Sequence, residues 1–308
     1  MKIGFFGANS NIARDLIINF HKEVKNELYL FTRNAGILRR WMIKNQIDSR
    51  FEIYEYHQLN NQLKLDLLIN FIGTANPAIA IDLGASILEI TFKYDSLALQ
   101  YLKKIPTCKY IFLSSGAAFG TTFNQPVDAG TNAIVPLNNI TFQNWYSISK
   151  LYAEVRHRSM PELSIIDLRI FNYFSHRQDM DSSFLITEIV RAIRDKKLFI
   201  TNLDEIIRDF IHPIDFYQLI LKLVRQGHLN VALDCYSKQP VLKNELLTSM
   251  ANKFGLMYKA IDSCGYENSA TGLKPFYYSV NKKAETYGYE PTYTSINGLH
   301  KEFSLLFS

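Results

Sequence analysis

The sequence predicts an α/β fold in which a doubly wound parallel sheet carries a smaller lobe. The chain has 308 residues, of which 47% are hydrophobic and 20% charged, a composition typical of a globular protein with a large core. Up to Ile170, short apolar runs alternate with longer stretches of helical period, as in βαβ units. At about 150 residues per domain, the length allows two domains, or one domain with a smaller lobe.

Each apolar run before Ile170 predicts one strand of the sheet. In chain order the expected strands are Lys2–Phe6, Glu27–Thr32, Phe51–Tyr56, Leu67–Ile72, Tyr110–Ser114 and Ser164–Ile170. The helices expected between them are Asn11–Phe20, Ile79–Lys104 and Trp145–Met160. Parallel strands joined through helices form a doubly wound sheet, whose ligands bind outside the carboxyl ends of the strands.

After Arg169 the alternation becomes less regular and predicts the smaller lobe. The expected helices are Phe184–Asp195, Phe216–Arg225 and Lys243–Lys253, with short strands near Phe199 and Phe210 and at Val231–Tyr236. The last stretch, Ser295–Leu306, is amphipathic and is expected to pack on the lobe as a helix. Because no low-complexity linker separates the two parts, we expect an interleaved α/β lobe.

The charge balance argues against a nucleic-acid partner. Thirty-four Lys and Arg residues against 29 Asp and Glu residues give a net charge of +5, spread thinly along the chain, which favours a small anionic ligand. The three cysteines, Cys108, Cys235 and Cys264, lack metal-binding spacing and predict a reducing, cytoplasmic environment without a metal site. No signal peptide and no run of about 20 apolar residues is present, so we expect no membrane association.

A glycine turn follows the first expected strand. Gly7 begins the sequence Gly-Ala-Asn-Ser-Asn-Ile-Ala, which opens the first expected helix. A dinucleotide site needs a tight turn here, a close backbone approach and helix N–H groups that face the pyrophosphate. Ser10 and Ala13 replace two further glycines, but both are small. Taken alone, the turn fits a structural connector equally well.

The end of the second expected strand indicates which dinucleotide would bind. It reads Leu-Phe-Thr32-Arg33, without the acidic residue that usually meets a free ribose 2′-hydroxyl. An arginine at this point pairs with a 2′-phosphate, so the sequence favours NADP over NAD. The alternative is that Arg33 is a solvated loop cation.

Tyr146 and Lys150 form a candidate proton-transfer pair. They lie four residues apart on one face of an expected helix, where the cation is expected to lower the pKa of the phenol. The composition predicts about one such pair by chance. A second pair, Tyr278 and Lys282, does occur, and we interpret it as surface structure.

The residues upstream of Tyr146 distinguish the two pairs. The segment Ile111–Gly120 reads as a strand that ends in Ser114, Ser115 and Gly116, at the sheet edge where ligands bind. Ser115 could donate a hydrogen bond to a substrate oxygen beside Tyr146. If this segment stood alone, a simple turn would be the preferred interpretation.

In these motifs the chain resembles the extended short-chain dehydrogenase/reductase family of nucleotide-sugar epimerases, dehydratases and 4-ketoreductases. Six segments match in the family's order along nearly the whole chain: FGANSNIA at Phe6, IFLSSGAAFG at Ile111, YSISK at Tyr146, LRIFNY at Leu168, RDFIHPID at Arg208 and YGYEP at Tyr287. The resemblance implies a Rossmann domain at residues 1–172. It also implies a mainly substrate-binding lobe at 173–308, with segments near 208–240 returning to the Rossmann domain.

The resemblance also implies roles for individual residues. The implied catalytic residues are Ser115, Tyr146 and Lys150. The implied cofactor-binding residues are Gly7, Asn9, Ser10, Asn11, Ile12, Thr32, Arg33, Ile72, Gly73, Tyr146, Lys150 and Phe171. The implied substrate-binding residues are Thr74, Ser115, Gly116, Asn172 and Arg208, the last two as contacts to the diphosphate.

The chain departs from the family pattern at several positions. Ser10 and Ala13 replace glycines, the third strand lacks an aspartate near Tyr56, and Thr91 replaces an asparagine in the long helix before Ser115. The loop Gly73–Pro77, which would border the sugar, also differs. These changes concern cofactor affinity and the proton relay, while the catalytic residues are intact.

The leading hypothesis is an NADP-dependent reductase of a 4-keto-6-deoxy-sugar nucleotide, which would serve surface polysaccharide synthesis. One alternative is a nucleotide-sugar 4-epimerase with tightly held NAD, and another is a non-catalytic NADP-binding sensor or partner protein. A dehydratase would need an acid–base pair beside the tyrosine, and Ser115-Gly116-Ala117 supplies none. By resemblance, the helices Ile79–Lys104 and Trp145–Met160 could form a homodimer interface.

Overall fold

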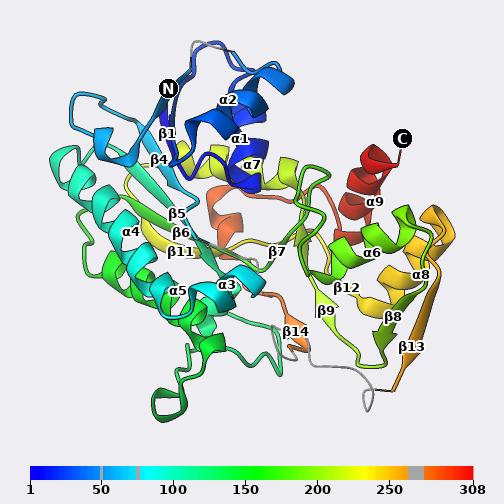
Figure 1. Cartoon of the computed structure of the whole chain (residues 1–308). Helices are drawn as coiled ribbons and strands as arrows, with labels where there is room; N and C mark the ends of the chain where they lie inside the picture. Colours follow the sequence, from blue (N-terminus) through cyan, green and yellow to red (C-terminus); the bar gives the residue numbers. More distant parts are fainter. Residues whose placement is uncertain (49–50, 74–76, 263–273, 308) are drawn as a thin grey trace.

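The computed structural model describes residues 1–48, 51–73, 77–262 and 274–307. They form a large parallel sheet with helices on both faces, and a smaller lobe lies beside it (Figure 1). The helices are α1 Asn11–Phe20, α2 Ala35–Lys44, α3 Pro77–Leu83, α4 Ser86–Lys104, α5 Phe142–Arg158, α6 Leu185–Arg194, α7 Pro213–Val224, α8 Lys243–Phe254 and α9 Ser295–Leu306. Short 3₁₀ helices are η1 Tyr56–Gln58, η2 Gly116–Phe119, η3 Leu137–Asn139 and η5 Lys283–Tyr287.

The large sheet has seven strands in the order β11-β6-β5-β4-β1-β2-β3. Its strands are β1 Lys2–Phe6, β2 Glu27–Phe31, β3 Glu52–Tyr54, β4 Leu67–Asn70, β5 Lys109–Ser115, β6 Ile165–Ile170 and β11 Asn230–Asp234. All pairs are parallel, and the order runs outward in both directions from β1 and β4. The predicted doubly wound fold is therefore confirmed.

Alternate side chains of the strands build one core on each face of the sheet. Phe5 packs in a cluster with residues of α1 and α7, whereas its neighbour Phe6 packs in the cluster beneath α4 and α5. Both phenylalanines are fully buried. A strand buried on both faces is apolar along most of its length, which explains the nearly continuous apolar runs.

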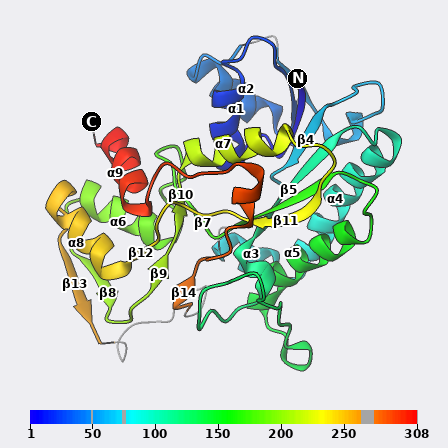
Figure 2. The same cartoon turned by 180° about the vertical axis from the view of Figure 1, so that it is seen from behind.

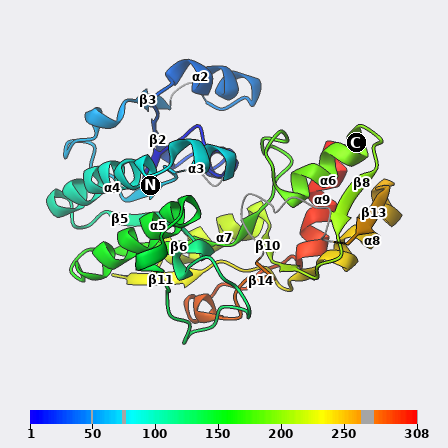
Figure 3. The ribbon, with the colours of Figure 1, turned by 60° about the horizontal axis from the view of Figure 1, so that its bottom comes forward.

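The smaller lobe is built from short strands and three helices. Its strands are β7 Asn172–Tyr173, β8 Phe199–Asn202, β9 Ile207–Arg208, β10 Phe210–Ile211, β12 Val241–Leu242, β13 Tyr258–Ile261 and β14 Phe276–Tyr277. Helices α6, α8 and α9 enclose a third apolar cluster that includes Ile189, Leu247 and Phe303. Figures 2 and 3 show this lobe to one side of the large sheet, with β14 lying between the two.

Three expectations about the elements were wrong in detail. The helix expected at Ile79–Lys104 is two helices, because Gly84 adopts a left-handed φ of +51° that ends α3 before α4 begins. Helix α2 was not expected. The strand at Val231–Tyr236, expected with the lobe, is β11, which pairs in parallel with β6 and becomes the seventh strand of the large sheet. Among the described residues, no helix has both the length and the apolar character needed to cross a bilayer.

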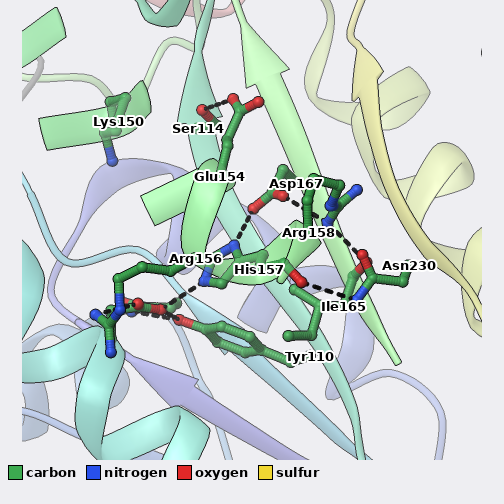
Figure 4. Close-up of polar contacts among 12 residues, drawn as sticks. Tyr110, Ser114, Lys150, Glu154, Arg156, His157, Arg158, Ile165, Asp167 and Asn230 are labelled. Atoms are coloured by element: carbon green, nitrogen blue, oxygen red, sulfur yellow. Dashed lines mark hydrogen bonds and ion pairs between the residues drawn. The ribbon is translucent and has the colours of Figure 1, made fainter. Parts of the chain in front are cut away.

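A buried charge cluster ties α4 and α5 to the sheet (Figure 4). The imidazole of His157 on α5 lies between two carboxylates, with Nε2 2.8 Å from Asp95 on α4 and Nδ1 2.6 Å from Asp167 on β6. Arg156 and Arg158 pair with the same carboxylates at 3.0 and 2.8 Å. Burial alone would lower the pKa of His157, but the charges and hydrogen bonds of Asp167 and Asp95 outweigh it and raise the pKa to about 9.

We expect His157→Leu to lower the free energy of unfolding by about 3–5 kcal/mol, because it leaves two buried carboxylates partly unpaired. The raised pKa stabilises the fold fully below the unfolded value of 6.5, and this stabilisation is lost as the pH rises through about 9. Urea unfolding across this pH range should therefore show that the free energy of unfolding of the wild type falls as the pH rises, whereas that of His157→Leu lacks this dependence.

The control is His57→Leu, whose side chain is 75% exposed beside Glu55. It should unfold like the wild type. A His157→Leu protein with wild-type stability would contradict the assignment of a stabilising imidazolium.

Candidate active site

The first wall of the site is the turn between β1 and α1. Gly7 has a φ of +78°, and a Cβ there would lie 3.2 Å from the carbonyl carbon of Phe71 and 3.3 Å from Ile72. Any other residue would therefore be strained and crowded. The side chain of Ser10, the N-cap residue of α1, makes no capping hydrogen bond, and the first turn carries no acidic residue. Asn11 and Ile12 are the first two residues of this helix.

The end of β2 lies next to this turn. The side-chain amide of Asn9 donates to the Thr32 hydroxyl at 2.7 Å and to the Asn34 carbonyl at 3.0 Å. Thr32 is buried, whereas Arg33 is exposed. Asn9 thus fixes the turn against the strand end and leaves the Arg33 guanidinium at the surface.

At the end of β5, two neighbouring serines have different surroundings. Ser114 donates a short hydrogen bond to Glu154 (Figure 4). Glu154 in turn forms a 2.6 Å ion pair with Arg169. Ser115 points to the other side, as alternation along a strand requires, and lies 3.2 Å from the Tyr277 hydroxyl. Ser114 is therefore part of the structural network, and Ser115 is free to serve the site.

Helix α5 brings Tyr146 and Lys150 to the same place. The Lys150 ammonium donates to the Leu113 carbonyl at 2.7 Å, lies 4.6 Å from the centre of the Phe112 ring, and would be 3.4 Å from a Cβ at Gly73. Burial lowers the pKa of Lys150 to about 8, although nearby carboxylates oppose this shift. The loop after β4, with Ile72 and Gly73, thus borders the lysine.

The expectation of a lowered pKa at Tyr146 was wrong. Burial raises the pKa of the phenol, the neighbouring Tyr277 raises it further, and a hydrogen bond with Ser115 offsets only part of the increase. Lys150 does not reverse the shift, because its ammonium bonds Leu113 and lies 5.8 Å from the centre of the Tyr146 ring. Tyr146 is therefore a neutral phenol in this state of the protein.

Gly116 and Phe171 pack against each other. A Cβ at position 116 would lie 2.4 Å from the Phe171 ring, so this position cannot carry a side chain without displacing the ring. Phe171 also meets the Tyr277 ring edge-on, with 5.3 Å between ring centres. The rings of Phe171 and Tyr277 therefore form a packed aromatic surface beside Ser115.

A pair of cations lies on the lobe side of the site. Arg208 donates to the carbonyls of Ile207 and Lys274, and no acidic side chain in the described part of the chain forms an ion pair with Arg208 or Lys274. Burial lowers the pKa of Arg208 to about 10. Burial, together with the Arg208 charge, lowers the pKa of Lys274 to about 8. Two partly buried like charges with which no described carboxylate pairs form an attractive site for an anion.

Some sequence candidates have other surroundings. The Asn172 amide donates to the carbonyls of Asp209 at 3.2 Å and Tyr277 at 3.5 Å, so it holds β7 to neighbouring segments. Thr74 lies outside the described residues. Tyr278 and Lys282 do not share a helix, because Tyr278 follows β14 and Lys282 precedes η5.

Sequence reasoning missed Lys274 and Tyr277. Neither belongs to a motif with a fixed spacing, and the contact between Ser115 and Tyr277 spans 162 positions of the chain. A Tyr-rich stretch next to a lysine was visible, but only the pairing of β14 with β9 places it in the site.

A family model matches residues 43–232, described as the NAD dependent epimerase/dehydratase family. The chain belongs to this family. It is therefore an enzyme of the NAD(P)-dependent oxidoreductase type. No match was found among curated proteins.

Solved structures of this family share the fold over the whole chain. UDP-glucuronic acid 4-epimerase from Bacillus cereus, solved with UDP-glucuronic acid and NAD, has a TM-score of 0.80 at 17% identity, covering 100% of this chain and 99% of that one. UDP-N-acetylglucosamine 4-epimerase from Methanobrevibacter ruminantium has a TM-score of 0.79 at 15% identity, covering 99% of this chain and 97% of that one. dTDP-glucose 4,6-dehydratase from Bacillus anthracis has a TM-score of 0.79 at 15% identity, covering 100% of this chain and 96% of that one.

Proposed function

We propose that this protein is a nucleotide-sugar 4-epimerase that uses a bound nicotinamide dinucleotide. The observation that carries the proposal is the convergence of Ser115, Tyr146 and Lys150 at the carboxyl edge of the sheet, between the glycine turn and the cation pair. The fold is shared with 4-epimerases along its whole length, which supports this activity over the reductase favoured by the sequence.

The residues around the turn fit a dinucleotide. Gly7 lets the backbone approach the ligand, and the uncapped N-terminus of α1 at Ser10, Asn11 and Ile12 favours a pyrophosphate. Asn9, Thr32 and Arg33 would border the adenosine ribose, and Ile72, Gly73 and Phe171 the nicotinamide half. When bound, the dinucleotide accepts and returns a hydride.

Each catalytic residue has a distinct task. The neutral phenol of Tyr146 must first ionise; as a phenolate it would take the proton from the sugar hydroxyl as the hydride leaves, and return it afterwards. Ser115 donates a hydrogen bond to the same sugar oxygen. The Lys150 ammonium has three donors and uses one on Leu113 among the described residues, so the others can hold the nicotinamide ribose. Its charge also favours the phenolate of Tyr146 during transfer.

The cation pair fits the diphosphate of the sugar nucleotide. The planar guanidinium of Arg208 can bind two phosphate oxygens at once, and Lys274 adds a second charge. A diphosphate would relieve the repulsion between these two cations. We also propose Gly116 as a neighbour of the sugar and Asn172 as a further contact of the diphosphate.

The two parts of the chain then divide the work. We propose that residues 1–172 hold the dinucleotide, helped by the segment near 208–240, which contributes β11 to the sheet and α7 to the core on one face of it. The rest of 173–308 binds the sugar nucleotide. The half-exposed apolar side chains Phe92, Tyr152 and Val155 on α4 and α5 support a homodimer through these helices.

Dehydration is less compatible with this site. It would need an acid and a base beside Ser115, but the Phe171 ring leaves no room for a side chain at position 116, and position 117 is alanine. A reductase of 4-keto-6-deoxy-sugar nucleotides remains the second candidate, because Arg33 stands exposed at the end of β2 where an NADPH 2′-phosphate would lie. Its product would serve surface polysaccharide synthesis.

We expect Tyr146→Phe to lower kcat by about 10²–10⁴, since it removes the proton-transfer group. Purified protein with NAD is incubated with UDP-glucose, UDP-N-acetylglucosamine or UDP-glucuronic acid, and the C4 epimers are separated by chromatography. Cofactor binding should persist in the variant. The control is Tyr152→Phe on the same helix, at a residue that is 47% exposed. Retained epimerisation by Tyr146→Phe would refute the assigned role.

Cofactor preference separates the two candidates. We expect Arg33→Met to weaken NADPH binding about tenfold and to leave NADH binding unchanged, because only the 2′-phosphate meets the guanidinium. Fluorescence titration measures both affinities, with the exposed Arg225→Met as control. NADPH consumption with a 4-keto-sugar nucleotide supports the reductase, whereas tightly bound NAD in the purified protein supports the epimerase.

Affinity for either dinucleotide should fall as the pH rises through about 8. The folded-state pKa of Lys150 is lowered to about 8 by burial, so the ammonium that donates to the ribose is lost above that pH. Titrations at pH 7 and pH 9.5 measure the change. Lys150→Met should bind weakly at both values, and the exposed Lys104→Met should behave like the wild type. A pH-independent wild type would contradict this role.

A further inference from the structure

The phenol of Tyr277 is a second hydroxyl group next to Ser115, the candidate catalytic serine. It lies on β14, which pairs in parallel with β9 so that Tyr277 stands opposite Arg208. Its hydroxyl is 3.2 Å from the Ser115 hydroxyl. Ser115 therefore has two phenols as hydrogen-bonding neighbours, Tyr146 from α5 and Tyr277 from the lobe.

The ring of Tyr277 is held in place on several sides. Phe123 and Phe171 meet it edge-on, with ring centres at 4.7 and 5.3 Å. The Lys274 ammonium lies 5.0 Å from the ring centre, and Asn172 bonds the Tyr277 carbonyl at 3.5 Å. Because both ring and backbone are fixed, the hydroxyl has a defined position at Ser115.

The hydrogen-bonding capacity of these groups sets the direction of the bond. A serine hydroxyl has one proton to donate and two lone pairs that accept. The Ala117 N–H donates to the Ser115 oxygen at 3.2 Å, and it also reaches the Tyr277 oxygen. If Tyr277 donates to the second lone pair of Ser115, the only proton of Ser115 is left to point toward Tyr146.

We propose that Tyr277 is a positioning residue that makes Ser115 an obligate hydrogen-bond donor, whose one proton points toward Tyr146 in the ligand-free protein and toward the substrate oxygen once substrate is bound. Without the Tyr277 hydroxyl, Ser115 can rotate its proton away and present a lone pair to the substrate. The role of Ser115 in turnover rests on the proposed function, whereas the contact between Ser115 and Tyr277 does not. Tyr277 acts through Ser115 and transfers no proton to the substrate.

The kinetic test compares Tyr277→Phe with Tyr278→Phe, which removes the neighbouring phenol. Tyr277→Phe keeps the ring packing and should lower kcat about tenfold, with KM changed less than twofold. Tyr278→Phe should behave like the wild type. In a Ser115→Ala background, Tyr277→Phe should have no further effect on kcat, because the group it orients is gone. An unchanged kcat, or a full effect in the Ser115→Ala background, would overturn the proposal.

A second measurement needs no substrate. Urea unfolding of wild type, Ser115→Ala, Tyr277→Phe and the double variant forms a double-mutant cycle on the ligand-free protein. Coupling between the two changes supports the proposal, and strict additivity overturns it. If the wild type converts no nucleotide sugar, the proposed function fails, and this cycle still decides whether Tyr277 holds Ser115.

Discussion

The interaction on which the site most depends is the buried imidazolium between Asp95 and Asp167. It joins α4, α5 and β6 at distances of 2.8 and 2.6 Å in a place without solvent. The same helix carries Tyr146 and Lys150, so the cluster sets how far these side chains lie from the end of β5. A buried charge that loses its partner is costly, which makes this geometry hard to vary.

The candidate active-site groups meet because parallel strands end at one edge. Gly7 follows β1, Ile72 follows β4 and Ser115 ends β5, all on the carboxyl side of the sheet. The lobe closes the other side through β14, whose Tyr277 reaches Ser115. A ligand held at this edge would touch the sheet, α5 and the lobe together. Fold and chemistry are thus linked by strand direction.

The electrostatics of the site favour an anionic ligand. Burial lowers the pKa of Lys150, Arg208 and Lys274, and no carboxylate in the described part of the chain forms an ion pair with any of the three. A ligand that brings negative charge would raise these values again and be bound more tightly in return. The net charge of +5 spread over the whole chain conceals this local concentration.

The sequence by itself determined most of the sheet, because strands buried on both faces are largely apolar. Its motifs also predicted Gly7, Ser115, Tyr146 and Lys150 as site residues, because the chemistry expected there allows few residue types. It did not show the break at Gly84, which depends on one left-handed residue. The raised pKa of Tyr146, and the places of Lys274 and Tyr277, were decided only by the tertiary structure. The burial of Tyr146, and the contact between Ser115 and Tyr277 across 162 positions of the chain, arise from tertiary packing. Local sequence patterns do not contain that information.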